Sequence, residues 1–227
     1  MPGTLCTGAV FDGLLDGLSV PQKARHVVAM RHLDVEDYLD EVQALCTADT
    51  LVCGFSLGAL VAAHLADRLP AAEIILFALN PHADGPDRHA GRLALAADVA
   101  RKGGAAGIAS RLPPLGGPQK AEARAQILKM AEESAAMKSA QTELALKRPG
   151  ALIRLAKTRV PVRIFAGTED SWTPIYHAHD AATAAPLGDV TALPGLGHCA
   201  LVEDPGACID ALRENRAKGA ARGQSAL

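Results

Sequence analysis

The stretch CGFSLGAL, residues 53–60, places Ser56 between two glycines, Gly54 and Gly58. The run TLVCGF (50–55) is short and apolar, which predicts a buried strand. After the serine, residues recur at helical spacing: Leu57, Leu60, Val61, His64 and Leu65. A serine on a sharp turn between a strand and a helix, with glycines where the two nearly touch, is typical of a nucleophile elbow. We therefore expect the Ser56 hydroxyl to stand above the carboxyl end of a sheet.

The rest of the chain alternates short apolar runs with segments of helical pattern. Strands are predicted at RHVVAM (25–30), TLVCGF (50–55), EIILFAL (73–79), RVPVRIFAG (159–167) and DVTALPG (189–195). Asp34 is expected to cap the helix that follows the first run. Short continuous strands separated by helices indicate an α/β fold, a mostly parallel sheet with helices on both faces.

Residues 82–150 interrupt this alternation, because they contain no convincing strand. The segments 92–100 and 119–146 have helical composition. We interpret 82–150 as a helical cap inserted into a core formed by 1–81 and 151–216. Two ordinary covering helices are the alternative. Residues 217–227 have little apolar content and are expected to form a flexible tail.

The composition excludes several classes of protein. Apolar residues make up 49% of the 227, which is globular, and the net charge of −2 gives no electrostatic basis for binding nucleic acid or a membrane surface. We find no run long enough to span a membrane and no signal peptide. Five cysteines without C-x-x-C spacing indicate reduced thiols in the cytoplasm and no zinc site. His177 and His179, two apart, are predicted to be surface residues and not metal ligands.

A serine nucleophile needs a general base, and the base needs a third group to orient it. Asp170 follows a predicted strand in FAGTEDSWTP (165–174), and His198 follows the last strand in LPGLGHCALVEDP (193–205). The chain order Ser, Asp, His is the order of an α/β-hydrolase triad. We predict that Ser56, Asp170 and His198 form such a triad. His64 and Cys199 are interpreted as packing residues.

The segments GFSLG, GTEDSWTP and GLGHCALVEDP resemble the nucleophile, acid and histidine segments of the α/β-hydrolase superfamily, in its small, cap-bearing, esterase-like branch. The resemblance implies Ser56 as nucleophile, Asp170 as acid and His198 as base, with Asp84 as second-choice acid. It also implies an oxyanion hole formed by two backbone N–H groups. One belongs to Leu57, and the other to Thr4, which follows Pro2-Gly3. No cofactor and no metal are expected.

The beginning of the chain departs from this family pattern. Relatives carry a strand before the Pro-Gly pair, but here Met1 alone precedes it. That strand lies in mid-sheet beside the nucleophile strand, so its loss would leave backbone groups unpaired. Either the true chain begins upstream, which we favour, or TLCTGAV (4–10) is the strand and Phe11-Asp12-Gly13 is the oxyanion turn. Residues 10–18 otherwise have helical spacing.

Together these features predict a serine hydrolase that cleaves a small carboxylic ester through an acyl-enzyme. Phe55 and Trp172 are expected to contact this small-molecule substrate. The cap residues Leu112, Leu115 and Met130 are expected to line an apolar pocket for a small apolar acyl group. Other chemistry on the same triad remains open: C–C hydrolysis, acyl transfer or cofactor-free peroxidation. A non-catalytic binding protein on the same fold is a further alternative, and the sequence does not indicate the oligomeric state.

Overall fold

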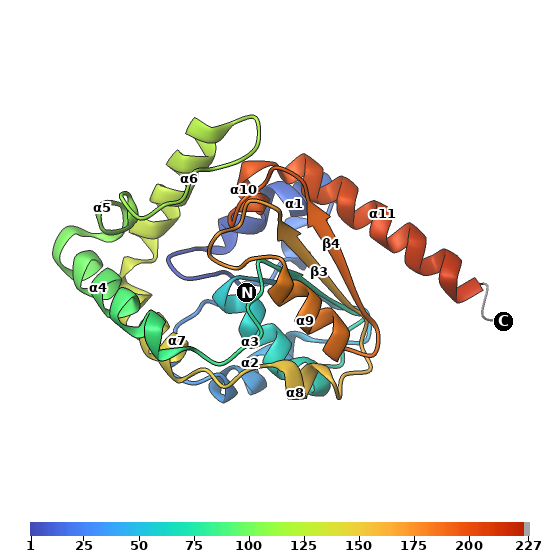
Figure 1. Ribbon diagram of the computed structural model, residues 1–227. Helices are drawn as coiled ribbons and strands as arrows, with labels where there is room; N and C mark the ends of the chain where they lie inside the picture. Colours follow the sequence, from blue (N-terminus) through green and yellow to red (C-terminus); the bar gives the residue numbers. More distant parts are fainter. Residues whose placement is uncertain (225–227) are drawn as a thin grey trace.

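Four parallel strands form the sheet in the computed structural model, which describes residues 1–224 (Figure 1). They are β1 (Leu51–Phe55), β2 (Glu73–Phe77), β3 (Val162–Gly167) and β4 (Gly188–Leu193), in the order β1-β2-β3-β4. Gly54 lies opposite Leu76, and Phe77 lies opposite Phe165. Strand β2 is buried along its whole length because it has a neighbour on each side and helices over both faces.

The predicted strand at 25–30 is wrong. The segment is irregular, although Val28 and Met30 are buried against the core while Val27 is exposed. The Arg25 guanidinium donates to the carbonyl of Val20, and no strand of the described chain pairs with the segment. An apolar run predicts burial, but a strand also needs a hydrogen-bonded neighbour, which is missing here.

Helices cover both faces of the sheet. One face carries α2 (Leu39–Leu45), α3 (Leu57–Leu65), α8 (Leu152–Leu155) and α9 (Tyr176–Ala184). The other carries α1 (Asp12–Gly17), α10 (Ala200–Glu203) and α11 (Pro205–Gln224). Short 3-10 helices are η1 (Gly8–Phe11), η2 (Gln22–Ala24), η3 (Glu36–Tyr38) and η4 (Ala66–Arg68). No helix in the described chain has the length and apolar character needed to cross a membrane.

Between β2 and β3 the chain forms α4 (Pro86–Lys102), α5 (Gly104–Ile108), α6 (Lys120–Glu133), η5 (Ala135–Met137) and α7 (Lys138–Lys147). These helices lie together at one side of the sheet (Figure 1). We call residues 82–150 the cap segment. Its longer helical stretch divides at Ser134, whose hydroxyl donates to the Met130 carbonyl. Ile127 on α6 and Gln141 and Leu144 on α7 are buried.

Helix α11 extends to Gln224, so it contains most of the segment 217–227 that was expected to be a flexible tail. Arg216 anchors the helix near this point by donating to Glu73 on β2. The following residues, AKGAARGQ (217–224), include three alanines, which favour helix, and two glycines, which do not. Residues 225–227 lie outside the described residues.

The outer edge of β1 carries Met1. Its amine donates to the Cys53 carbonyl at 2.9 Å, and its carbonyl accepts the Phe55 N–H at 3.1 Å. This pattern places Met1 beside Gly54 in parallel register. Residues 4–10 do not form the strand that we considered, because they form a turn and the start of η1. Beside β1 lies a cavity of about 750 Å³ with mainly apolar walls.

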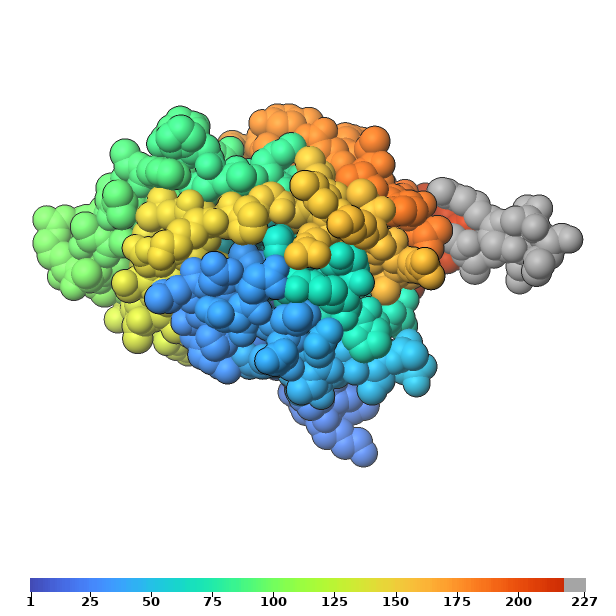
Figure 2. Space-filling model, turned by 90° about the horizontal axis from the view of Figure 1, so that it is seen from below, coloured from blue at the N-terminus to red at the C-terminus, as the bar shows by residue number. Residues whose placement is uncertain are grey.

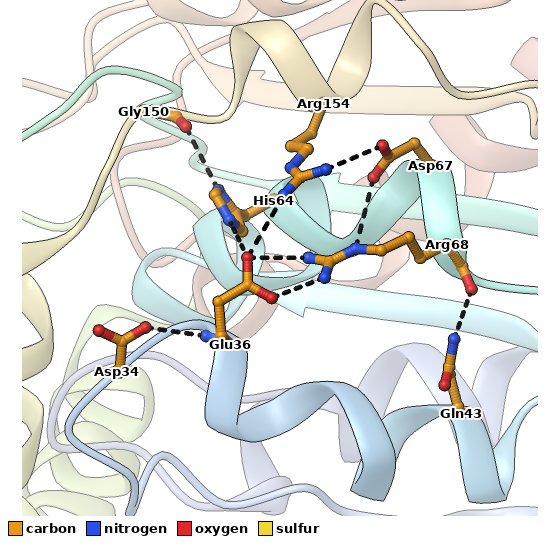
Figure 3. A network of polar contacts seen from close by, with 8 residues as sticks. All are labelled: Asp34, Glu36, Gln43, His64, Asp67, Arg68, Gly150 and Arg154. Atoms are coloured by element: carbon orange, nitrogen blue, oxygen red, sulfur yellow. Dashed lines mark hydrogen bonds and ion pairs between the residues drawn. The ribbon is translucent and has the colours of Figure 1, made fainter.

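His64 packs within α3, as predicted, and also joins a group of charged residues. Its Nε2 lies 3.0 Å from Glu36 Oε1, Arg68 donates to Glu36, and Arg154 donates to Asp67 (Figure 3). We call Glu36, His64, Asp67, Arg68 and Arg154 the Glu36 network. They come from η3, α3, η4 and α8, which meet on the face shown in Figure 2 in blue, teal and yellow.

Candidate active site

Ser56 lies on a strained turn between β1 and α3. Its φ of 50° and ψ of −112° are rarely adopted by residues other than glycine. A Cβ on Gly54 would lie 2.6 Å from Ala59 Cα, and one on Gly58 would lie 2.2 Å from the Met1 carbonyl oxygen. Gly54 is therefore required for β1 and α3 to approach this closely, and Gly58 is required for the N-terminal residues Met1 and Pro2 to pack against α3. The turn holds Ser56 at the carboxyl end of the sheet, as the sequence predicted.

Ser56, His198 and Asp170 form a hydrogen-bonded row. His198 Nε2 lies 3.0 Å from Ser56 Oγ, and His198 Nδ1 lies 2.8 Å from Asp170 Oδ2. Ser56 follows β1, Asp170 follows β3 and His198 follows β4. The carboxyl ends of parallel strands share one edge of a sheet, so residues distant in sequence meet there. The structure thus brings the three predicted residues together.

The Asp170 carboxylate is buried and fully hydrogen-bonded. Its Oδ1 accepts the N–H groups of Trp172 and Thr173, each at 2.8 Å, and its Oδ2 accepts the Thr173 hydroxyl and faces His198. Burial acts to raise the pKa of Asp170, but the hydrogen bonds from His198 and Thr173 outweigh it, so the pKa is lowered. An ionised carboxylate here favours a proton on His198 Nδ1, which leaves Nε2 free to accept the Ser56 proton.

Asp84, the second-choice acid, is engaged elsewhere. Arg92 donates to both of its carboxylate oxygens, at 2.8 and 2.6 Å, and Arg148 Nη2 lies 3.3 Å away. The structure therefore places Asp170, and not Asp84, against His198. Asp84 follows β2 as expected, but its carboxylate is bound by Arg92 and Arg148 and does not contact His198.

The two predicted oxyanion donors lie at the same cavity as Ser56. Leu57 is the first residue of α3, a position whose N–H has no partner within a helix. Thr4 lies in a tight turn with Leu5, which has a φ of 54°. The Leu5 N–H donates to Gln141 Oε1 at 3.0 Å, so a buried side chain of α7 fixes this turn. Thr4 and Leu57, from two separate segments, thus border the cavity beside Ser56.

Buried Glu203 fixes the loop that carries His198. Its Oε2 accepts the N–H of Gly197 at 2.6 Å and of Gly116 at 2.8 Å, and its Oε1 accepts the N–H of Cys199 at 3.0 Å. The residues on both sides of His198 are therefore held, and the cap segment is tied to the same carboxylate. Glu203 was not predicted from the sequence. A glutamate close behind the Cys199 helix start is a capping-box-like signal that could have found it.

A cavity of about 470 Å³ opens at Ser56. Phe55 and Trp172 line it, as predicted, and their rings pack against His198 with centroid distances of 5.4 and 5.0 Å. Leu112 also lines the cavity. Leu115 and Met130 pack in the core cluster instead of lining it, so these two predictions are wrong.

The same cavity is strongly cationic. Five basic residues line it, all from the cap segment: Arg88, Arg92, Arg111, Lys138 and Arg148. In the described chain its walls contain no aspartate or glutamate. The remaining walls are mainly apolar, in agreement with the predicted apolar pocket, but these cations were not predicted from the sequence. These residues are scattered over 61 positions of sequence, and the packing of α4, α5 and α7 brings them to one wall.

Two buried thiols and a group of two histidines and an aspartate lie outside the triad. Burial raises the pKa of Cys6 to about 12 and that of Cys199 well above its ordinary value, which fits packing roles. His177 is buried, so its prediction as a surface residue is wrong. Potential metal-ligand atoms of His82, His177 and Asp180 lie within 4.8 Å of one another. His82 Nε2 and Asp180 Oδ2 are already hydrogen-bonded at 2.8 Å.

Comparisons with known proteins agree with this architecture. A family model described as alpha/beta hydrolase family matches residues 16–211. No curated protein gives a significant match. Among solved structures, a thermophilic esterase from Thermogutta terrifontis with malate bound is 19% identical, with a TM-score of 0.75, and 96% of this chain and 88% of that chain are covered. An enol-lactonase from Burkholderia xenovorans LB400 is 18% identical, with a TM-score of 0.75 and coverages of 94% and 88%.

A third similar structure is a bromoperoxidase from Bacillus anthracis, 13% identical, with a TM-score of 0.71 and coverages of 91% and 86%. The three names describe three different activities. At these sequence identities, the similarity between this chain and the three structures shows a shared fold and does not identify the reaction.

Proposed function

The chain belongs to the alpha/beta hydrolase family, and we propose that it is a serine hydrolase that cleaves small carboxylic esters through an acyl-enzyme. The observation that supports this most directly is the row from Ser56 through His198 to Asp170 on a strained elbow. The row faces a cavity large enough for a small molecule.

The proposed mechanism follows from these contacts. His198 Nε2 accepts the Ser56 proton as Oγ attacks the ester carbonyl, and Asp170 orients and stabilises the charged imidazole. The N–H groups of Leu57 and Thr4 donate to the oxyanion, and one such donor contributes roughly 10²–10³ in rate. His198 then protonates the leaving alcohol. Water deprotonated by His198 attacks the acyl-enzyme and releases the acid, so none of these steps uses a metal or a cofactor.

The test is covalent labelling of the protein with a fluorophosphonate, together with hydrolysis of short neutral esters. We expect the wild type to do both and Ser56→Ala to do neither while it keeps the wild-type unfolding temperature. The exposed Ser110→Ala is the matched control and should label and hydrolyse normally. A folded wild type that takes up no label and cleaves no ester would contradict the proposal and favour a binding protein on this fold.

Asp170→Asn separates the acid from the nucleophile. The amide cannot favour the productive histidine tautomer, so kcat should fall by up to about 10⁴ while the fold persists. Asp84→Asn should retain most of kcat, because Asp84 is bound by Arg92 and Arg148. The reverse result would transfer the acid role to Asp84.

A further inference from the structure

The cations that line the catalytic cavity have too few carboxylate partners. Arg92 and Arg148 share the single carboxylate of Asp84. Arg111 binds Asp98, which Arg101 and Lys102 also bind. Since the whole chain carries a net charge of −2, this local excess of positive charge does not follow from the composition.

Lys138 is the clearest case. Its residue is 4% exposed, and Nζ makes one polar contact within the described chain, to the Thr142 hydroxyl one turn further along α7. A buried ammonium normally has a carboxylate beside it, because burying an unpaired charge is costly. Burial and, to a smaller extent, the charge of Arg92 lower the pKa of Lys138 to about 8. It is therefore still largely charged at neutral pH, and it lines the cavity.

Arg148 adds unused donors to the same wall. Its residue is 7% exposed, and its Nε and Nη2 have no hydrogen-bond acceptor within the described chain, although Nη2 lies 3.3 Å from Asp84. The planar guanidinium presents its N–H groups as a fork that matches two oxygens of a carboxylate or a phosphate. Arg148 and Lys138 both line the cavity, so an anion bound there would compensate the positive charge of both side chains.

We infer that the substrate carries an anionic group, a carboxylate or a phosphate, which Lys138 and Arg148 bind while the ester lies at Ser56. This inference rests on the proposed function and adds the substrate class to it. The core supplies the reacting groups, and the cap segment supplies the cations. A cavity of about 470 Å³ fits a small acidic ester.

The experiment compares three ethyl esters of similar chain length. Monoethyl glutarate carries a carboxylate, its phosphonate analogue carries a phosphonate in the same place, and ethyl hexanoate is neutral. Acid release in a pH-stat gives kcat/KM for each. We expect at least one anionic ester to exceed the neutral ester by about tenfold or more, because hydrogen bonds to a charged group contribute about that much. The faster of the two anionic esters identifies the preferred group.

Lys138→Met removes the charge and nearly keeps the shape. We expect it to lower the ratio of anionic to neutral kcat/KM about tenfold, mainly through KM of the anionic ester. The matched control is Lys147→Met on the same helix, because Lys147 is exposed and paired with Glu143 at 3.2 Å. The control should keep the wild-type ratio. Arg148→Met is the second variant and replaces Lys138→Met if that protein does not fold.

Each outcome decides one point. A ratio near one in the wild type, or a ratio that survives both Lys138→Met and Arg148→Met, overturns the inference. Intact hydrolysis of ethyl hexanoate together with fluorophosphonate labelling would then leave the proposed function standing. If the wild type cleaves none of the esters and takes up no label, the proposed function fails, and the inference fails with it.

Discussion

The Glu36 network and the cationic cavity both gather charged side chains, but only the Glu36 network balances them. In that network Glu36 and Asp67 face Arg68 and Arg154, with nitrogen–oxygen distances between 2.6 and 3.7 Å (Figure 3). In the cavity, Lys138 has a hydroxyl as its partner, and Arg148 shares the single carboxylate of Asp84 with Arg92. Matched charges are sufficient to hold elements together, whereas unmatched buried charges oppose folding and indicate a ligand.

This difference predicts opposite responses to the removal of one charge. Loss of a charge from the Glu36 network should destabilise the fold, because its former partners lose an ion pair. Loss of a charge from the cavity should stabilise the fold and impair binding. Such a trade between stability and function is common at binding sites.

The largest effect on stability is expected for Lys138→Met. The folded-state pKa of Lys138 is lowered from 10.5 to about 8, so the unfolded chain holds the proton more tightly than the native chain. At neutral pH the buried charge therefore costs stability, and its removal should raise the free energy of unfolding by roughly 2–3 kcal/mol. Urea unfolding at pH 7 measures this. The exposed Lys147→Met should change little, and a destabilised Lys138→Met would contradict the contrast between the two regions.

Glu203 lies between the two cases, because its buried carboxylate has no cationic partner but accepts hydrogen bonds from backbone N–H groups. Glu203→Gln turns a donor amide toward the N–H groups of Gly197 and Gly116, so at least one bond that holds the His198 loop is lost. We expect kcat to fall about ten- to a hundredfold for anionic and neutral esters alike, since one charged hydrogen bond contributes about that much.

The measurement that identifies this positioning role is the ratio of kcat/KM for the anionic ester to kcat/KM for the neutral ester. Glu203→Gln should slow fluorophosphonate labelling and leave the anionic preference unchanged, unlike Lys138→Met. Glu214→Gln, exposed on α11, is the control. Unchanged labelling in Glu203→Gln would assign Glu203 to folding alone.

The sequence predicted well those features that depend on local pattern. Apolar runs located all four strands. The glycines around Ser56 located the elbow, where a Cβ on either glycine would collide with neighbouring backbone. The triad could be predicted because parallel strands bring their carboxyl ends to one edge, whatever the distance in sequence. The segment 25–30 failed because its apolar residues are buried without a neighbouring strand.

Features that depend on packing between distant elements could not be predicted. His177 is buried because His82 and Tyr176 lie against its ring, and no spacing rule places His82 there. The basic residues of the cap segment were not singled out from the sequence, because they are scattered along it in a chain of net charge −2. Their convergence on one cavity depends on how the helices of the cap segment pack against one another, and the inferred anionic group of the substrate rests on this convergence.

The anionic preference should also depend on pH. Lys138 loses its charge as pH rises through about 8, and the other basic residues that line its cavity are Arg88, Arg92, Arg111, Arg148 and His198. The four arginines keep their charge over this range, so KM for the anionic ester should rise a few-fold above about pH 8 without complete loss of binding. The ratio of anionic to neutral kcat/KM measures this directly. In Lys138→Met the ratio should be flat, and a parallel decline in that variant would exclude Lys138 as the cause.

The smallest effect is expected at Glu36, with the opposite sign to Lys138→Met. The Arg68 hydrogen bond is the main cause that lowers the pKa of Glu36 from 4.5 to about 2, and His64 contributes less. A lowered carboxylate pKa gives stability that is present above about pH 4.5 and is lost as pH falls toward 2. Because the Glu36 side chain is 47% exposed, water screens the pair, and Glu36→Gln should cost at most about 1 kcal/mol. Urea unfolding of the wild type and Glu36→Gln between neutral and acid pH tests this, with Glu122→Gln, exposed on α6, as control. The difference in free energy of unfolding between the wild type and Glu36→Gln should vanish at acid pH. A difference that persists there would show that Glu36 acts through packing and not through its charge.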